Sequence, residues 1–244
     1  MYFKQKLYII ISIFLLTGFQ TEPGGEILPL IIPTKPQVWT VQVSDAAERV
    51  QETFNLCNDA IPGVSLLVEQ STPEEIITEP ADFVFASDSL DMPESKVFLL
   101  YEESFNVVTH FEVPVYSLTM TQMQDIYTGR VTDWSNIDIT SSYKGEIQRF
   151  GYFEGSDLQG AFEQTLGEDV VGKWHLVPDP EAMLDSIFKT PYAIGFLPEW
   201  AVGQSVNIVE IEDRELKLQI IVYSREESTA SLNWLRCLHS ELNP

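Results

Sequence analysis

The stretch that decides the fold reads SLTMTQMQDIYTGRVTDWSNI, from Ser117 to Ile137. Thr119 is placed to cap a helix, and Gln122, three residues later, can complete a capping box. From Met123 onward, apolar residues repeat at helical spacing. Gly129 supplies the left-handed residue that commonly ends a helix. The segment therefore predicts a short helix whose two ends are both fixed by local chemistry.

On both sides of this helix, strand and helix patterns alternate along the chain. The predicted strands are Trp39–Val43, Val64–Val68, Ala81–Ala86, Tyr192–Leu197 and Leu216–Tyr223. The other predicted helices begin at Ser44, Ser156, Pro180 and Ser228. Strands interleaved with helices indicate an α/β sheet with crossover connections.

Three of these helices carry more detailed expectations. In the helix that begins at Ser156, Gln159 stands at the capping-box position and Gly167 is the expected stop. We expect the helix 180–188 to turn Met183, Leu184, Ile187 and Phe188 inward. We expect the C-terminal helix to bury Leu232, Leu235 and Leu238 or His239.

The charge of the chain excludes some classes of partner. The 244 residues include 37 acidic and 14 basic side chains, which gives a formal net charge of −23. Nucleic-acid binding needs a basic surface, so no nucleic-acid partner is expected. Adhesion to anionic lipid is disfavoured for the same reason. A small anion stays compatible, because backbone N–H groups can bind it locally.

The first residues are expected to direct export. Lys4 and Lys6 precede an apolar run from Leu7 to Leu16, which is short for a membrane span and typical of a signal peptide. Residues 1–25 are therefore interpreted as a signal peptide or an uncleaved N-terminal anchor, and 26–37 as a linker. The expected location is extracytoplasmic, periplasmic in a two-membrane cell.

Two cysteines, Cys57 and Cys237, lie far apart in the sequence. They form no C-x-x-C motif, so no zinc or redox motif is predicted. Export would permit a disulfide between them, and two buried free thiols are an equally good interpretation.

The segment 117–137 resembles a motif of the phosphate-type solute-binding proteins of ABC transporters. Its Leu, Thr, Gln, Ile, Gly and Trp positions fall in register with that motif. Three further segments resemble the family in the expected order, and they are ADFVFASDSL (81–90), YFEGSDLQGAFEQTLG (152–167) and TPYAIGFLP (190–198). The resemblance implies a two-lobed periplasmic-binding-protein fold, with lobe one at 38–107 plus 196–244, lobe two at 108–195, and a ligand cleft between them.

The resemblance also implies a set of ligand-binding residues. The family binds an anion through hydroxyl groups, backbone N–H groups at helix N-termini, an Asp and an Arg. Carried onto this sequence, the candidates are Ser44, Asp45, Ser87, Asp88, Tyr152, Gly155, Ser156 and Asp157.

Two of these positions depart from the family pattern. Tyr152 stands where the family has its Arg, and Asp157 stands where it has a Gly after the serine. A carboxylate about 4 Å from a bound anion would repel it by roughly 4 kcal/mol at an effective dielectric constant of 20. Losing a bidentate Arg removes about 1.5–3 kcal/mol more.

Two functions therefore stay open. The first is binding of a small oxyanion such as phosphate and its delivery to the permease of an ABC-type transporter. The second is a degenerate binding-protein fold that acts as an envelope sensor or protein-interaction module.

No enzyme is predicted, because no catalytic constellation, metal-binding spacing or cofactor motif is found. Paired acids such as Glu102-Glu103 are expected to be solvated surface.

Overall fold

The computed structural model describes residues 37–87, 92, 95–137, 143–167, 174–212 and 214–243. The expected export segment and all of the linker except Gln37 lie outside them and stay predictions. No helix among the described residues is long and apolar enough to cross a membrane.

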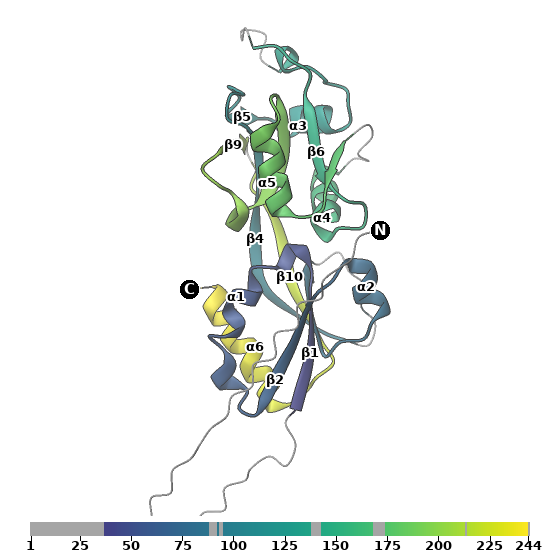
Figure 1. Ribbon diagram of the computed structural model, residues 1–244, viewed down its shortest axis with the longest axis vertical. Helices are drawn as coiled ribbons and strands as arrows, with labels where there is room; N and C mark the ends of the chain where they lie inside the picture. The colour runs from purple at the N-terminus through teal and green to yellow at the C-terminus, as the bar shows by residue number, and fades with distance from the viewer. Residues whose placement is uncertain are drawn as a thin grey trace, which may run out of the picture.

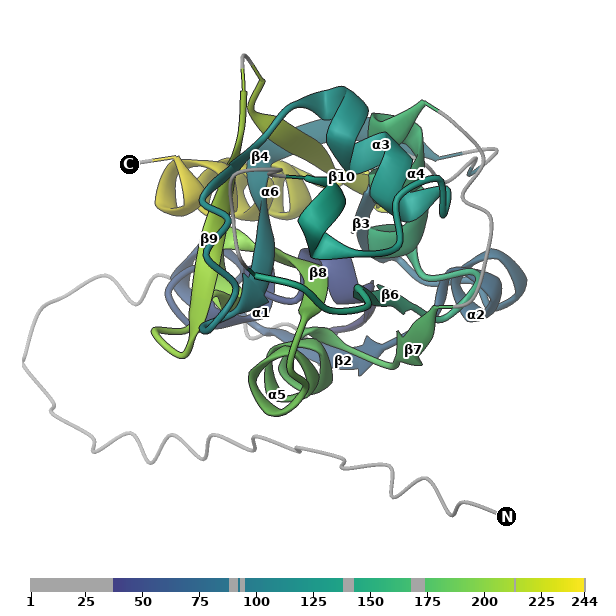
Figure 2. The same cartoon turned by 90° about the horizontal axis from the view of Figure 1, so that it is seen from above.

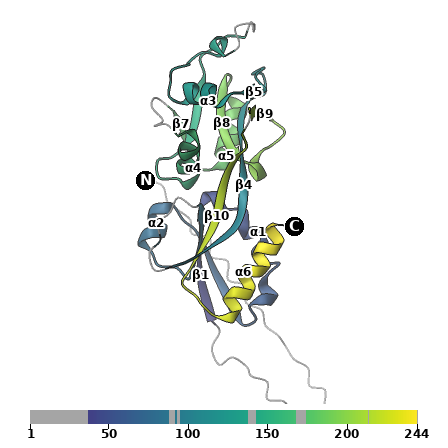
Figure 3. The same cartoon turned by 180° about the vertical axis from the view of Figure 1, so that it is seen from behind.

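Two lobes are stacked along the long axis of the molecule (Figure 1). Two long strands run through the junction, β4 (Lys96–His110) and β10 (Leu216–Ser224), and they pair with each other antiparallel. Seen from behind, the same two strands form the visible connection between the lobes (Figure 3). One continuous sheet, in the order β2-β1-β3-β10-β4-β8-β6-β7, therefore runs through both lobes.

Lobe one is built on three parallel strands, β1 (Gln37–Val43), β2 (Val64–Gln70) and β3 (Phe83–Ser87). Its helices are α1 (Val50–Phe54), α2 (Pro73–Thr78) and α6 (Thr229–Leu242). Helices α1 and α6 lie on one side of the sheet and α2 on the other (Figure 3).

An aromatic cluster fills the core of lobe one. The ring of Trp234 on α6 lies 5.0–5.9 Å from four rings on β1, α1 and β3. Those four are Trp39, Phe54, Phe83 and Phe85. Aromatic pairs at these separations bury large apolar areas, so they fix α6 and α1 on the sheet.

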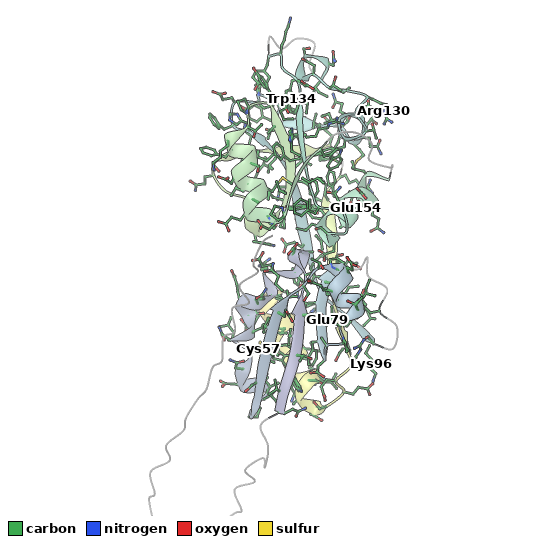
Figure 4. The ribbon with its side chains drawn as sticks, turned by 45° about the vertical axis from the view of Figure 1, so that its right-hand side comes forward. Cys57, Glu79, Lys96, Arg130, Trp134 and Glu154 are labelled. Carbon is green, nitrogen blue, oxygen red and sulfur yellow. A yellow bond between two sulfur atoms is a disulfide. The ribbon has the colours of Figure 1, made fainter. Side chains whose placement is uncertain are left out.

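A disulfide joins Cys57 to Cys237, whose Cα atoms are 5.8 Å apart. It links α6 to the turn that enters the 3₁₀ helix η2 (Asn58–Ala60) in lobe one, where Figure 4 labels Cys57. Of the two interpretations that the sequence allowed, the structure supports the bridged one.

Lobe two is built on β8 (Ala193–Pro198), β6 (Gln148–Tyr152) and β7 (His175–Val177), with β9 (Val206–Ile211) and β5 (Ser117–Leu118) at its edge. Its helices are α3 (Met120–Tyr127), α4 (Asp157–Leu166) and α5 (Pro180–Lys189). Viewed from above, α5 covers one side of the sheet, and α3 and α4 cover the other (Figure 2).

The helix predicted from the opening stretch is confirmed as α3. Thr119 Oγ1 accepts a hydrogen bond from the Gln122 N–H at 3.1 Å, and Gln122 Oε1 accepts one from the Thr119 N–H at 2.8 Å. Gly129 has a φ of +78°. The predicted strands and the helices expected from Ser156, Pro180 and Ser228 are also present, with bounds shifted by a residue or two. The helix expected from Ser44 is not continuous, because the chain forms the 3₁₀ helix η1 (Asp45–Ala47) and then the short helix α1.

Three local expectations were wrong. Phe188 is 46% exposed, because its neighbour Ile187 takes the inward face of α5 and Phe188 packs at the surface against Phe111. Leu232 is likewise 39% exposed. Gln159 forms no capping box, because its Oε1 accepts from the Tyr152 N–H and its Nε2 donates to Glu163.

The division into two lobes remains a proposal, and the strand pairing changes the residue at which we place one boundary between them. Strands β8 and β9 pair with the half of β4 that lies in lobe two. We therefore place the return to lobe one at β10 and not at residue 196.

Candidate functional site

The first part of the candidate site lies where β1 ends in lobe one. Ser44 follows this strand, is fully buried, and precedes the 3₁₀ helix η1 (Asp45–Ala47). Its hydroxyl does not cap η1 but donates to Oδ2 of Asp157 at 2.5 Å. The backbone N–H of Ala46 donates to Oδ1 of Asp157 at 3.3 Å.

The second part comes from the neighbouring strand. Ser87 is the last residue of β3, and its backbone N–H donates to Oδ2 of Asp157 at 3.1 Å. Strands β1 and β3 are parallel and adjacent, so their carboxyl ends meet at one edge of the sheet, where α/β proteins bind ligands.

Asp157 itself belongs to lobe two. It is the first residue of α4 and only 2% of its surface is exposed. Just before it, Gly155 has a φ of +87°, a left-handed conformation that glycine adopts without strain. The Asp157 carboxylate therefore crosses the junction, and three donors of lobe one, the Ser44 hydroxyl and the Ala46 and Ser87 N–H groups, surround it.

Among the residues that the structure describes, the charge of Asp157 is stabilised by hydrogen bonds from neutral groups. Burial raises the pKa of the Asp157 carboxyl, and the bonds from Ser44, Ser87, Ala46 and the Leu158 N–H oppose that rise. None of these donors belongs to Lys or Arg. The arrangement thus resembles a neutral oxyanion site, in which dipoles stabilise a negative charge.

More carboxylates surround this contact. Burial and the nearby Asp157 raise the pKa of Asp45 to about 6, against a hydrogen bond from Gln70 Nε2. Burial also raises the pKa of Glu48, and so do Asp179 and Glu181 of lobe two. The junction is therefore acidic on both sides.

The remaining predicted site residues are placed differently. The hydroxyl of Tyr152 donates to the Phe196 carbonyl within lobe two at 3.1 Å, and burial raises its pKa. Gly155 is exposed, and Ser156 caps α4 by position while its buried Oγ has no hydrogen-bond partner among the described residues. Asp88 lies outside the described residues.

One buried acid at the junction was not expected. Glu103 on β4 is 2% exposed, contrary to the expectation of solvated surface, and its carboxylate accepts from Arg49 Nη1 at 3.4 Å. The backbone of Glu199, in η4 (Glu199–Ala201), also donates to it. Its neighbour Glu102 is half exposed, so alternation along a strand was the signal that could have separated the two.

A small recess of about 200 Å³ lies beside this ion pair. The residues that line it are Glu48, Arg49, Gln51, Glu52, Gln70 and Trp200. Its two glutamates make it a poor place for an anion.

Figure 4 labels Glu154, close to the start of α4, at the end of lobe two that faces lobe one.

No family model matches the chain, and no curated protein matches it.

Solved structures do match. A protein described as a phosphate ABC transporter substrate-binding protein from Clostridium perfringens, with bound phosphate, aligns with a TM-score of 0.72 at 18% identity, over 83% of this chain and 93% of that one. An ABC-type phosphate transport receptor from Vibrio cholerae aligns with a TM-score of 0.66 at 19% identity, over 83% and 94%.

The same fold also occurs in regulators. The reduced form of OxyR from N. meningitidis aligns with a TM-score of 0.61 at 12% identity, over 85% of this chain and 97% of that one. Substrate-binding proteins and regulatory domains are both similar to this chain, and both are non-enzymatic in kind. The chain therefore has the two-lobed fold of the periplasmic binding proteins.

Proposed function

We propose that this protein is a non-enzymatic, extracytoplasmic protein that uses the solute-binding fold as a closed interaction module and does not carry free phosphate. One observation carries the proposal: the buried Asp157 carboxylate takes the donors at the strand ends of lobe one that an oxyanion would need.

The energetics support the absence of phosphate binding. Phosphate would have to displace Asp157 from its hydrogen bonds or sit beside it. A pair of charges about 4 Å apart repels by roughly 4 kcal/mol at an effective dielectric constant of 20, and Asp45 adds to this. Tyr152, at the position where the family has its Arg, carries no positive charge, and its hydroxyl already donates to the Phe196 carbonyl.

The disulfide supports the location. Disulfides persist in oxidising compartments and are rare in the cytosol. The Cys57–Cys237 bridge therefore agrees with the export expected from the first 25 residues.

A second candidate function is phosphate capture and delivery to an ABC-type permease. The similarity to substrate-binding proteins, one of which was solved with bound phosphate, favours it.

Titration calorimetry of the wild-type protein with phosphate at pH 7.5 separates the two functions. Our proposal expects no saturable binding up to about 1 mM phosphate, equivalent to less than about 4 kcal/mol of binding free energy. Saturable binding in the micromolar range or tighter would replace our proposal with the transport function.

A further inference from the structure

We propose that Asp157 is a built-in ligand: its carboxylate occupies an anion site formed by Ser44, Ala46 and Ser87 and thereby holds the two lobes closed. This inference rests on the proposed function and deepens it, because it identifies the group that fills the cleft and the change that its removal should cause.

The first support is the origin of the donors. They come from two strand ends of lobe one, whereas the carboxylate comes from lobe two, 113 residues after Ser44 and 70 residues after Ser87. The bonds are therefore links between the lobes. A ligand that closes a two-lobed protein acts in the same way, by bonding to both lobes at once.

The second support is that the buried donors are bonded to the Asp157 carboxylate. Ser44 is fully buried, and its hydroxyl is directed to Asp157 although it stands at the cap position of η1. A buried donor left without an acceptor costs about 1–3 kcal/mol. Without the carboxylate, these donors would be left unpaired or would have to be hydrated.

The third support is the residue beside Asp157. The Oγ of Ser156 is buried and has no hydrogen-bond partner among the described residues. Its position at the start of α4 is the one where the resemblance expects a ligand hydroxyl. The hydroxyl that could bind a ligand is therefore present, but the hydrogen bonds across the junction are made by the Asp157 carboxylate.

The size of the missing group defines the test. Changing Asp157 to Ala removes one carbon and two oxygens, which is the heavy-atom content of formate. Free formate should therefore fill the vacated place in the Asp157→Ala protein, in the millimolar range, because it must also be ordered on binding.

The experiment compares thermal unfolding of wild type and Asp157→Ala in sodium formate and in sodium chloride at equal ionic strength. We expect Asp157→Ala to melt roughly 3–10 °C lower in chloride. Formate should restore at least half of that loss in a saturable manner and leave wild type unchanged. Small-angle scattering should show formate returning Asp157→Ala to the compact shape of wild type.

Two matched variants test specificity. Asp179→Ala removes another aspartate of lobe two, whose Oδ1 accepts from the Ala182 N–H of its own helix, so formate should not rescue it. The double variant Ser44→Ala/Asp157→Ala lacks one donor and should lose most of the rescue. A parallel series with phosphate shows whether the vacated site also takes a tetrahedral anion.

The inference is overturned if folded Asp157→Ala gains no more from formate than from chloride, or if Asp179→Ala gains as much. If Asp157→Ala does not fold in chloride, refolding in formate decides: a cooperative transition only with formate supports the inference, and none in either salt overturns it. In Asp157→Asn an amide of the same size occupies the position of the carboxylate, so the melting temperature of this variant should not respond to formate. Phosphate binding by wild type would instead defeat the proposed function.

Discussion

At the scale of single residues, the acid at position 45 links pH to stability. Its pKa in the folded protein is about 6, raised from 3.8 mainly by burial and by Asp157. A carboxyl with a raised folded pKa binds its proton more tightly in the folded state, so stability is lost as the pH rises from about 4 through 6. Burial raises the pKa of Asp157 and Glu48 in the same direction.

We therefore expect the wild-type protein to melt at a higher temperature at pH 5 than at pH 7.5. In Asp45→Asn the amide does not titrate, so this variant should be more stable than wild type at pH 7.5, by on the order of 1–3 kcal/mol, and the advantage should shrink near pH 5. Melting curves of both proteins at the two pH values measure this. An advantage that is the same at both values would show that Asp45 titrates normally.

The residues at two helix N-caps, Thr119 and Ser156, allow a second test at the scale of single residues. Thr119 accepts a hydrogen bond from the Gln122 N–H, whereas the Ser156 hydroxyl makes none with the described residues. Thr119→Ala should lower the free energy of unfolding by about 1 kcal/mol, and Ser156→Ala should change it by less than about 0.5 kcal/mol. Urea unfolding of the two variants measures both values, and equal losses would contradict the assignment of caps.

At the scale of elements, the sequence predicted what local chemistry decides. Helix α3 was predictable because its capping box and its stop at Gly129 lie within a dozen residues. The exposed Phe188 and the buried Glu103 were not, because their surroundings are set by elements distant in the sequence.

The candidate site was predictable only in part, for the same reason. The sequence identified Ser44, Ser87 and Asp157 one by one, and it predicted that Asp157 would repel an anion. It could not predict that the Asp157 carboxylate would reach the donors itself, since that depends on how the lobes meet. The Ala46 N–H had no signal at all, because almost any residue carries one.

The bridge between η2 and α6 gives an element-scale prediction. Cys57 and Cys237 are separated by 180 residues, so the bridge closes a very long loop. The chain-entropy account assigns about 5 kcal/mol to such a loop, which corresponds to a loss of roughly 10–20 °C on removal. Melting of Cys57→Ser/Cys237→Ser against wild type, each with and without reductant, measures this. Reductant should lower the melting temperature of wild type alone, and a similar loss in both proteins would contradict the prediction.

At the scale of the whole molecule, a net charge of −23 opposes compaction. Added salt screens repulsion among surface carboxylates, with a Debye length near about 10 Å at 0.1 M. We expect the melting temperature to rise by roughly 2–4 °C between 20 and 300 mM sodium chloride, or about 1 kcal/mol. A flat or falling profile would show that ion pairs such as Lys96–Glu227 outweigh the repulsion.

The two crossing strands also set an order of assembly. Lobe two lies between β4 and β10 in the sequence, so in a chain that emerges N-terminus first it can be completed while lobe one still lacks β10 and α6. Until β10 arrives, one edge of β3 has no partner, and until α6 arrives, Cys57 has no thiol to join. Lobe one therefore stays unfinished until all of lobe two has emerged, and β10 and α6 then complete it.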